Sequence, residues 1–199
     1  MKAIKGIIWV LALGLLALPV TAGTVNMQFT GLPTGNNYWG VASYPYDLSV
    51  NGGPAKWMMC IGYYEHIEGG ETWQANVVSV GSLDLATHLS DYQAAFLFEM
   101  AIADHGGDSD VNAAAWYLME GAPSLTPGAQ TLVTLAQSQT FQQGEFGDVL
   151  LYQAIPGTES TNLGTAQDFL TSTPEPGTLA LLGSGLIGFA ALLRRKSLA

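Results

Sequence analysis

The feature that most constrains the fold of this chain is a change in the spacing of its apolar residues between residues 24 and 170. The first part contains apolar or alternating runs that are typical of β-strands, at residues 24–29, 46–50, 57–64 and 72–80. From Ser90 to Gln139 the apolar residues instead recur at helical spacing. Strand patterns return at 148–154 and 166–170. This order predicts an α+β domain, an antiparallel β-sheet or barrel with an inserted small helical subdomain.

Capping and turn residues set the expected boundaries of these elements. Asn51-Gly52 predicts a hairpin turn after the strand at 46–50. Three helices are expected, over residues 90–104, 109–120 and 126–139, because each begins at a residue suited to a helix start. Gly106-Gly107 and Gly121 end the first two. We expect the strands at 57–64 and 148–154 to lie in one sheet.

The first 22 residues are typical of a secretory signal peptide. Lys2 and Lys5 precede an apolar stretch at residues 7–18, and short residues surround a cleavage position after Ala22. The alternative is a first transmembrane helix, which the shortness of the apolar run and Pro19 disfavour. We therefore expect residues 1–22 to be removed and residues 23–171 to form an exported domain.

The last segment, residues 172–199, contains three features in a fixed order. Pro174, Glu175 and Pro176 come first, then an uncharged apolar stretch at 177–193, and then the basic residues Arg194, Arg195 and Lys196. The apolar stretch is long enough for a short transmembrane helix, and the basic cluster predicts that the chain end stays on the cytoplasmic side.

This trio resembles the PEP-CTERM sorting signal of Gram-negative bacteria that make exopolysaccharide. The resemblance implies recognition by an exosortase, which is a membrane enzyme, with processing near residues 174–176. It also implies that the protein is anchored in the inner membrane before processing and then reaches the cell surface or the extracellular matrix. The alternative is a plain single-span membrane anchor.

The charge of the middle of the chain excludes one class of partner. Residues 23–173 contain 15 acidic residues and a single basic one, Lys56. Such a surface repels phosphate groups, so we expect no nucleic-acid partner. Contact with exopolysaccharide or a surface glycan remains compatible with this composition. Aromatic residues such as Trp57 and Tyr64 suit either a core or a platform on which sugar rings stack.

Cys60 is the only cysteine, so the chain cannot form an intramolecular disulfide. Its neighbours Met59 and Ile61 are apolar, and a buried free cysteine usually packs as a small hydrophobic residue. The alternatives are a reactive role, lipidation or pairing with another chain.

Several short motifs together resemble the surface thioester domains of bacterial adhesins. They are a cysteine in an apolar strand, Gly70-Glu71-Thr72-Trp73, Ala114-Ala115-Trp116 in a helix, and Gln167-Asp168-Phe169-Leu170. In that family a cysteine thiolate attacks a late glutamine carboxamide, ammonia leaves and an internal thioester remains. The resemblance assigns Cys60 and Gln167 to this pair, with Gln153 in reserve. Asn112 stands where the family has a glutamine.

Motifs for enzymatic or metal chemistry are few. Asp104, Asp108 and Asp110 offer oxygen atoms to a calcium ion, but the spacing lacks the Gly and Glu of a calcium loop. The alternative is an acidic helix N-terminus, which the helix dipole favours. The sequence contains no Gly-x-Ser-x-Gly, no His-Glu-x-x-His and no glycine-rich phosphate loop. We therefore expect neither an enzyme nor a resident cofactor, and a structural or adhesive role.

Overall fold

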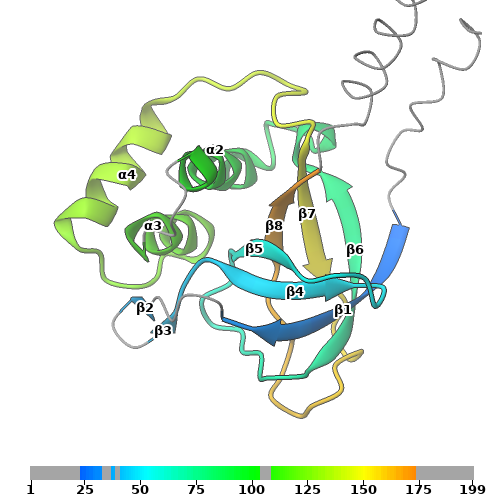
Figure 1. Cartoon of the computed structure of the whole chain (residues 1–199). Helices are drawn as coiled ribbons and strands as arrows, with labels where there is room; N and C mark the ends of the chain where they lie inside the picture. The colour runs from blue at the N-terminus through cyan, green and yellow to red at the C-terminus, as the bar shows by residue number, and fades with distance from the viewer. Residues whose placement is uncertain (1–22, 33–36, 39–40, 104–108, 174–199) are drawn as a thin grey trace, which may run out of the picture. The chain divides into compact units, whose positions relative to one another are not determined.

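The structure, a computed structural model, describes residues 23–32, 37–38, 41–103 and 109–173. All of these except Thr173 belong to one compact unit. The unit is a closed antiparallel barrel with the strand order β1-β4-β5-β8-β7-β6, and its helices lie together on one side (Figure 1). The barrel strands are β1 (Gly23–Gly31), β4 (Tyr46–Val50), β5 (Lys56–Cys60), β6 (Thr72–Ser79), β7 (Val149–Ala154) and β8 (Phe169–Ser172).

The helices α2 (Leu89–Ala103), α3 (Ser109–Glu120) and α4 (Pro127–Ser138) are inserted between β6 and β7. A short 3-10 turn, η2 (Val80–Ser82), follows β6, and a small hairpin of β2 (Asn37–Tyr38) and β3 (Val41–Ala42) precedes β4. The predicted α+β class and the inserted helices are confirmed. The sheet is closed into a barrel, and β5 and β7 lie in it with β8 between them.

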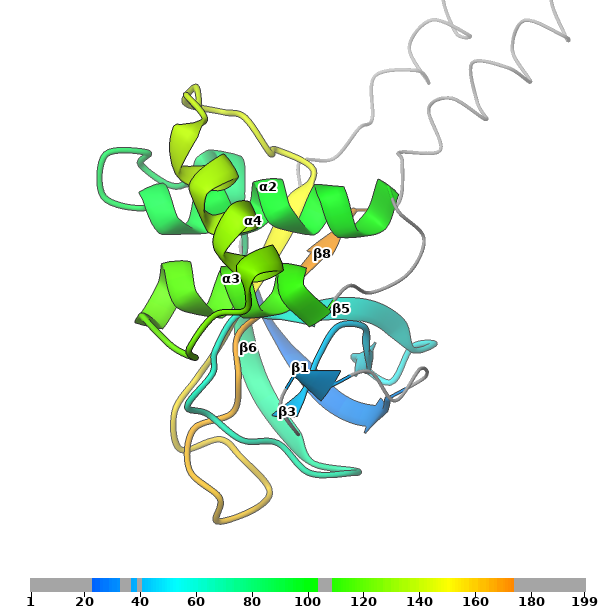
Figure 2. The same cartoon turned by 90° about the vertical axis from the view of Figure 1, so that its left-hand side faces the viewer.

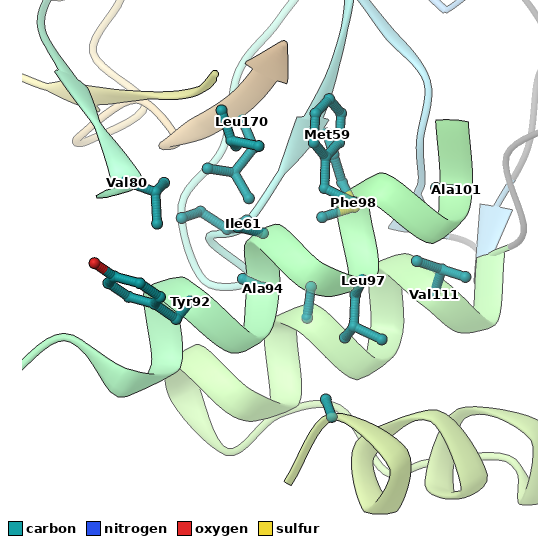
Figure 3. Close-up of a cluster of buried hydrophobic side chains, with 14 of the residues drawn as sticks. Met59, Ile61, Val80, Tyr92, Ala94, Leu97, Phe98, Ala101, Val111 and Leu170 are labelled. Atoms are coloured by element: carbon teal, nitrogen blue, oxygen red, sulfur yellow. The ribbon is translucent and has the colours of Figure 1, made fainter. Parts of the chain in front are cut away.

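Successive side chains of a strand point to opposite faces of the barrel wall, and this alternation divides the hydrophobic core into two clusters. Inward side chains such as Leu48, Cys60 and Trp73 fill the barrel. Outward side chains of β5, β7 and β8, including Met59 and Leu170, instead pack against α2 (Figure 3). Burying each large apolar side chain contributes about 1.5–3 kcal/mol, so both clusters stabilise the fold.

The helices form two layers on the barrel. The α2 helix contacts β8 and α3 contacts β5, while α4 packs on α2 and α3 (Figure 2). Ala113 and Trp116 of α3 belong to the barrel-interior cluster together with Cys60. Thr126 caps α4 by accepting a hydrogen bond from the N–H of Ala129. It also donates to Asp110 Oδ1 at 2.7 Å, which ties α4 to the start of α3.

Two strand predictions differ from the structure at their ends. The strand predicted at 57–64 ends at Cys60, because the N–H groups of Tyr63 and Tyr64 bond to the carboxylate of Glu120 instead of to a neighbouring strand. The strand predicted at 166–170 lies at 169–172, because Gln167 and Asp168 direct their side chains to other segments. The β2–β3 hairpin was not predicted.

The predicted signal peptide at residues 1–22 and the predicted transmembrane segment at 177–193 lie outside the described residues. Among the residues that the structure describes, no helix has the length and apolar character needed to cross a membrane.

Candidate functional site

The pairing of β5 with β8 brings Cys60 close to Gln167. Cys60 lies opposite Phe169, and the N–H of Ile61 donates to the carbonyl of Asp168 at 2.9 Å. The ladder thus continues one residue beyond β5. Gln167 directly precedes Asp168 in the chain, and its side chain reaches the carbonyl of Gly62, which follows Ile61.

Cys60 and Gln167 bond to the same carbonyl oxygen. The Cys60 thiol donates to the carbonyl of Gly62 with an Sγ–O distance of 3.0 Å, and Gln167 Nε2 donates to that oxygen at 3.2 Å. The sulfur and the amide nitrogen therefore lie no further apart than 6.2 Å, the sum of these distances. Gln167 Nε2 also donates to the carbonyl of Glu65 at 2.7 Å, which fixes the orientation of the amide.

Gln153, the reserve partner, lies on the opposite side of the barrel wall. It pairs with Asn76 across β7 and β6, and directly opposed residues point to the same face. Asn76 is exposed on the outer face, whereas Cys60 points into the barrel. Of the two glutamines, only Gln167 therefore shares the surroundings of the thiol.

The thiol of Cys60 lies in a dry and tightly packed setting. It is fully buried, so pairing with another chain or lipidation has no route to it in this conformation. Burial raises the pKa of the Cys60 thiol, and the nearby indole of Trp116 acts in the opposite direction by favouring the thiolate. The indole N–H of Trp116 has no acceptor at normal hydrogen-bond geometry among the described residues. The positive end of the indole N–H dipole favours the charged thiolate over the thiol.

Buried polar atoms without partners gather around this thiol. Within the described part of the chain, Trp116 Nε1, Gln167 Oε1 and Glu65 Oε2 are buried and make no hydrogen bond. Such atoms are uncommon in folded proteins and cost about 1–3 kcal/mol each when they stay unsatisfied. The surroundings of the Cys60 thiol therefore contain polar atoms that the described part of the fold does not satisfy.

Asn112 fixes the end of β5 against α3. It is fully buried; its Nδ2 donates to the carbonyl of Cys60 at 2.6 Å, and its Oδ1 accepts from the N–H of Tyr44 at 2.7 Å. The position that the resemblance assigns to a glutamine is thus occupied by a shorter amide that contacts the backbone of Cys60. Asn112 is a positioning residue for the thiol.

A small acidic pocket lies next to the pair. Its volume is about 300 Å³, and it is lined by Ile61, Gly62, Glu65, Met119, Glu120, Ala154, Thr165, Ala166 and Asp168. Burial is the main cause that raises the pKa of Asp168 to about 6, and Glu65, Asp91 and Glu120 add to it, against a hydrogen bond from Ala154 N–H at 2.7 Å. Burial also raises the pKa of Glu65.

These carboxylates were missed at the level of sequence. Glu65 and Glu120 are far apart in the chain, and only the pairing of β5 with β8 and the packing of α3 bring them to Asp168. The position of Asp168, directly after the candidate glutamine, was the one available signal.

The other predicted sites are less complete. Asp104 and Asp108 of the calcium candidate lie outside the described residues, and Asp110 accepts a hydrogen bond from Thr126. In the described ranges, no group of three or more His, Cys, Asp or Glu side chains is arranged to hold a metal ion. Most described aromatic residues fill the two core clusters, while Trp57 and Tyr64 are 53% and 67% exposed.

The C-terminal segment gives the clearest match to known proteins. Residues 172–196 match the family model described as the PEP-CTERM protein-sorting motif. The chain carries a PEP-CTERM sorting motif. The match confirms the prediction made from the proline pair, the apolar stretch and the basic cluster. The motif supports processing by exosortase, a membrane enzyme, and implies export and membrane anchoring before cleavage. No curated protein and no solved structure matches the chain.

Proposed function

We propose that this PEP-CTERM protein is displayed on the cell surface or in the extracellular matrix, where its barrel domain has a structural or adhesive role. The observation that carries the proposal is the sorting motif, whose match begins at Ser172, the last residue of β8. The barrel domain and the sorting segment are thus joined without a long linker. The acidic composition of residues 23–173 suits a protein that stays soluble outside the cell.

Replacement of Pro174, Glu175 and Pro176 by alanine tests this role. We expect the variant to remain full-length in the membrane fraction, while the wild-type protein is shortened and reaches the surface. The matched control replaces Asn162 and Leu163, which lie in an exposed loop of the barrel domain, by alanine. Processing of the motif variant at the wild-type rate would contradict the proposal.

A second proposal concerns how the domain attaches. We infer that Cys60 and Gln167 form an internal thioester that later reacts with a nucleophile on a target surface. The support is that the Cys60 thiol and Gln167 Nε2 both donate to the carbonyl oxygen of Gly62, which keeps the sulfur and the amide nitrogen within 6.2 Å of each other, the sum of the two distances. A side-chain rotation of Cys60 then carries the sulfur to the amide carbon.

The proposed reaction balances without any added reagent. The Cys60 sulfur bonds to the Gln167 side-chain carbon, the carbon–nitrogen bond of the amide breaks, and the thiol proton leaves with the nitrogen as ammonia. Attack requires the thiolate, which burial disfavours and the Trp116 indole favours. The acidic pocket is lined by Ile61 and Ala166, the chain neighbours of Cys60 and Gln167, so a local opening there would connect the buried bond with solvent.

The intact mass of the purified protein tests the bond. We expect the wild-type protein to be lighter than its sequence mass by one ammonia. The Gln167→Ala and Cys60→Ala variants should show no such deficit. Gln153→Ala is the matched control, because Gln153 lies on the outer face of the barrel and its loss should leave the deficit in place. A wild-type protein with full mass, and with a thiol that reacts with a thiol reagent once urea unfolds it, would refute the thioester.

A further inference from the structure

The outer face of β1 and β6 carries a strip of amide and hydroxyl side chains. Three directly opposed pairs make up this strip: Thr24 with Asn76, Asn26 with Gln74, and Gln28 with Thr72. All six side chains are exposed, on the side of the barrel wall away from the interior cluster. Asn76 is also opposed to Gln153 on β7, so the strip continues onto a third strand.

A hollow of about 560 Å³ lies along the part of this strip that contains the pairs Asn26–Gln74 and Gln28–Thr72. We call it the amide trough; its lining residues are Asn26, Met27, Gln28, Gly52, Thr72, Trp73, Gln74 and Thr158. The segment that contains Thr158 is held against β6, because Thr158 Oγ1 accepts from the N–H of Gln74 at 2.9 Å. Gly52 comes from the turn between β4 and β5. None of the lining residues is charged.

The amides of the trough are available to a ligand. The side chains of Asn26, Gln28 and Gln74 make no hydrogen bond to any described residue, whereas Asn76, just outside the trough, accepts one from Thr24. Each free amide offers two donor hydrogens and one acceptor oxygen. The backbone positions that carry these amides lie about 4.8 Å apart across the strands and about 6.8 Å apart along a strand. Two or three of them can therefore contact one small ligand unit together.

The chemistry of the trough excludes several kinds of partner. The barrel is closed, and both β1 and β6 are paired on each side, so no free edge can accept an added peptide strand. The absence of Lys, Arg, Asp and Glu from the lining gives no counter-charge for a phosphate, an anionic polymer or a cation. The exposed side chains of the trough are polar, which does not suit an apolar helix.

We propose that the amide trough binds an uncharged oligosaccharide, as part of a neutral extracellular polysaccharide. Sugar hydroxyl groups are both donors and acceptors, which matches the free amides, and no charge has to be stripped of water when they bind. The volume lies in the range of ligand sites, about 300–1,000 Å³. This proposal gives the adhesive role a partner and rests on the proposed surface location, but it does not depend on the thioester.

Binding is measured by titrating the purified full chain, held in a zwitterionic detergent that contains no sugar, with defined oligosaccharides. The probes are uncharged oligosaccharides released from dextran, cellulose and mannan, and an anionic oligogalacturonate. We expect saturable binding of at least one uncharged probe and none of the anionic one. The Asn26→Ala/Gln74→Ala double variant should weaken that binding at least tenfold, because it removes two of the free amides.

The matched control is Gln130→Ala, which removes an exposed amide on α4, away from the trough. It should bind as the wild type does. Circular dichroism should be unchanged for the double variant, since the lost side chains make no hydrogen bonds within the fold. The proposal is overturned if no uncharged probe binds, if the anionic probe binds equally well, or if the double variant binds like the wild type. Failure here would leave the surface location standing, because processing of the sorting motif tests that separately.

Discussion

The buried carboxyl group of Asp168 should make the stability of the barrel depend on pH. Burial, together with the nearby carboxylates Glu65, Asp91 and Glu120, raises its pKa from the ordinary value of 3.8 to about 6. Between these two values the folded chain binds more protons than the unfolded chain. The free energy of unfolding must then fall as the pH rises through this window. At about 1.4 kcal/mol per pH unit, the loss from Asp168 is about 2–3 kcal/mol.

The Asp168→Asn variant isolates this contribution. Asparagine keeps an oxygen that can accept from the N–H of Ala154 but cannot carry the charge. Above pH 7 the variant should be more stable than the wild type by about 2 kcal/mol, whereas near pH 4 the two should be close. The free energy of unfolding of the variant should still fall with rising pH, though less steeply, because burial also raises the pKa values of Glu65 and Glu99.

Urea unfolding, followed by fluorescence from pH 4 to pH 8, measures these free energies. Glu68→Gln, which removes an exposed carboxylate, is the matched control, and its curve should run parallel to that of the wild type. Parallel curves for Asp168→Asn and the wild type would show that the buried position of Asp168 does not control its protonation, and the reasoning would fail.

Two further predictions concern positions whose packing the structure defines. Asn112→Ala should lower the free energy of unfolding by about 2–6 kcal/mol, because it removes two buried hydrogen bonds. Gln130→Ala, an exposed amide on a helix, is its control, and an equal effect of both would contradict the positioning role. Gly81→Ala should cost about 1–3 kcal/mol, because an added Cβ would lie 2.7 Å from the carbonyl oxygen of Glu145. Gly69→Ala is the control, because a Cβ added at Gly69 has no atom within 4 Å. Equal urea midpoints for the two glycine variants would contradict the close contact between Gly81 and the backbone of Glu145.

The parts of the fold that local chemistry controls were predictable. The α3 and α4 helices begin and end where Ser109, Gly121 and Thr126-Pro127 indicated, because capping and helix-ending residues act on their own segment. The closure of the sheet was not predictable, since it depends on long-range pairings such as β1 with β6. Apolar composition misled the prediction for residues 61–64, where the backbone is bound by a carboxylate from α3.

In the candidate site, too, the sequence predicted some features, while others depend on pairing between distant segments. The resemblance named Cys60 and Gln167, and the structure brings the two together. It ranked Gln167 before Gln153 by motif alone, whereas the strand register, which decides the face that a residue occupies, places only Gln167 beside the thiol. The acidic pocket combines side chains from three distant segments, so no spacing in the sequence indicates it.

The position of β8 also determines how the domain bears mechanical load. A pull on the segment that follows β8 enters the fold at Ser172, and β8 is held by ladders to β5 on one side and to β7 on the other. To unfold the domain from this end, a force must break the hydrogen bonds of β8 to both neighbouring strands. A strand at the edge of an open sheet is held on one side only and therefore resists force less well. A nucleophile that opens the thioester stays bonded to the side-chain carbon of Gln167 and releases the Cys60 thiol, so tension runs along the chain from Gln167 through β8 to Ser172 and bypasses the helices. The helical subdomain could then vary in evolution without weakening the attachment.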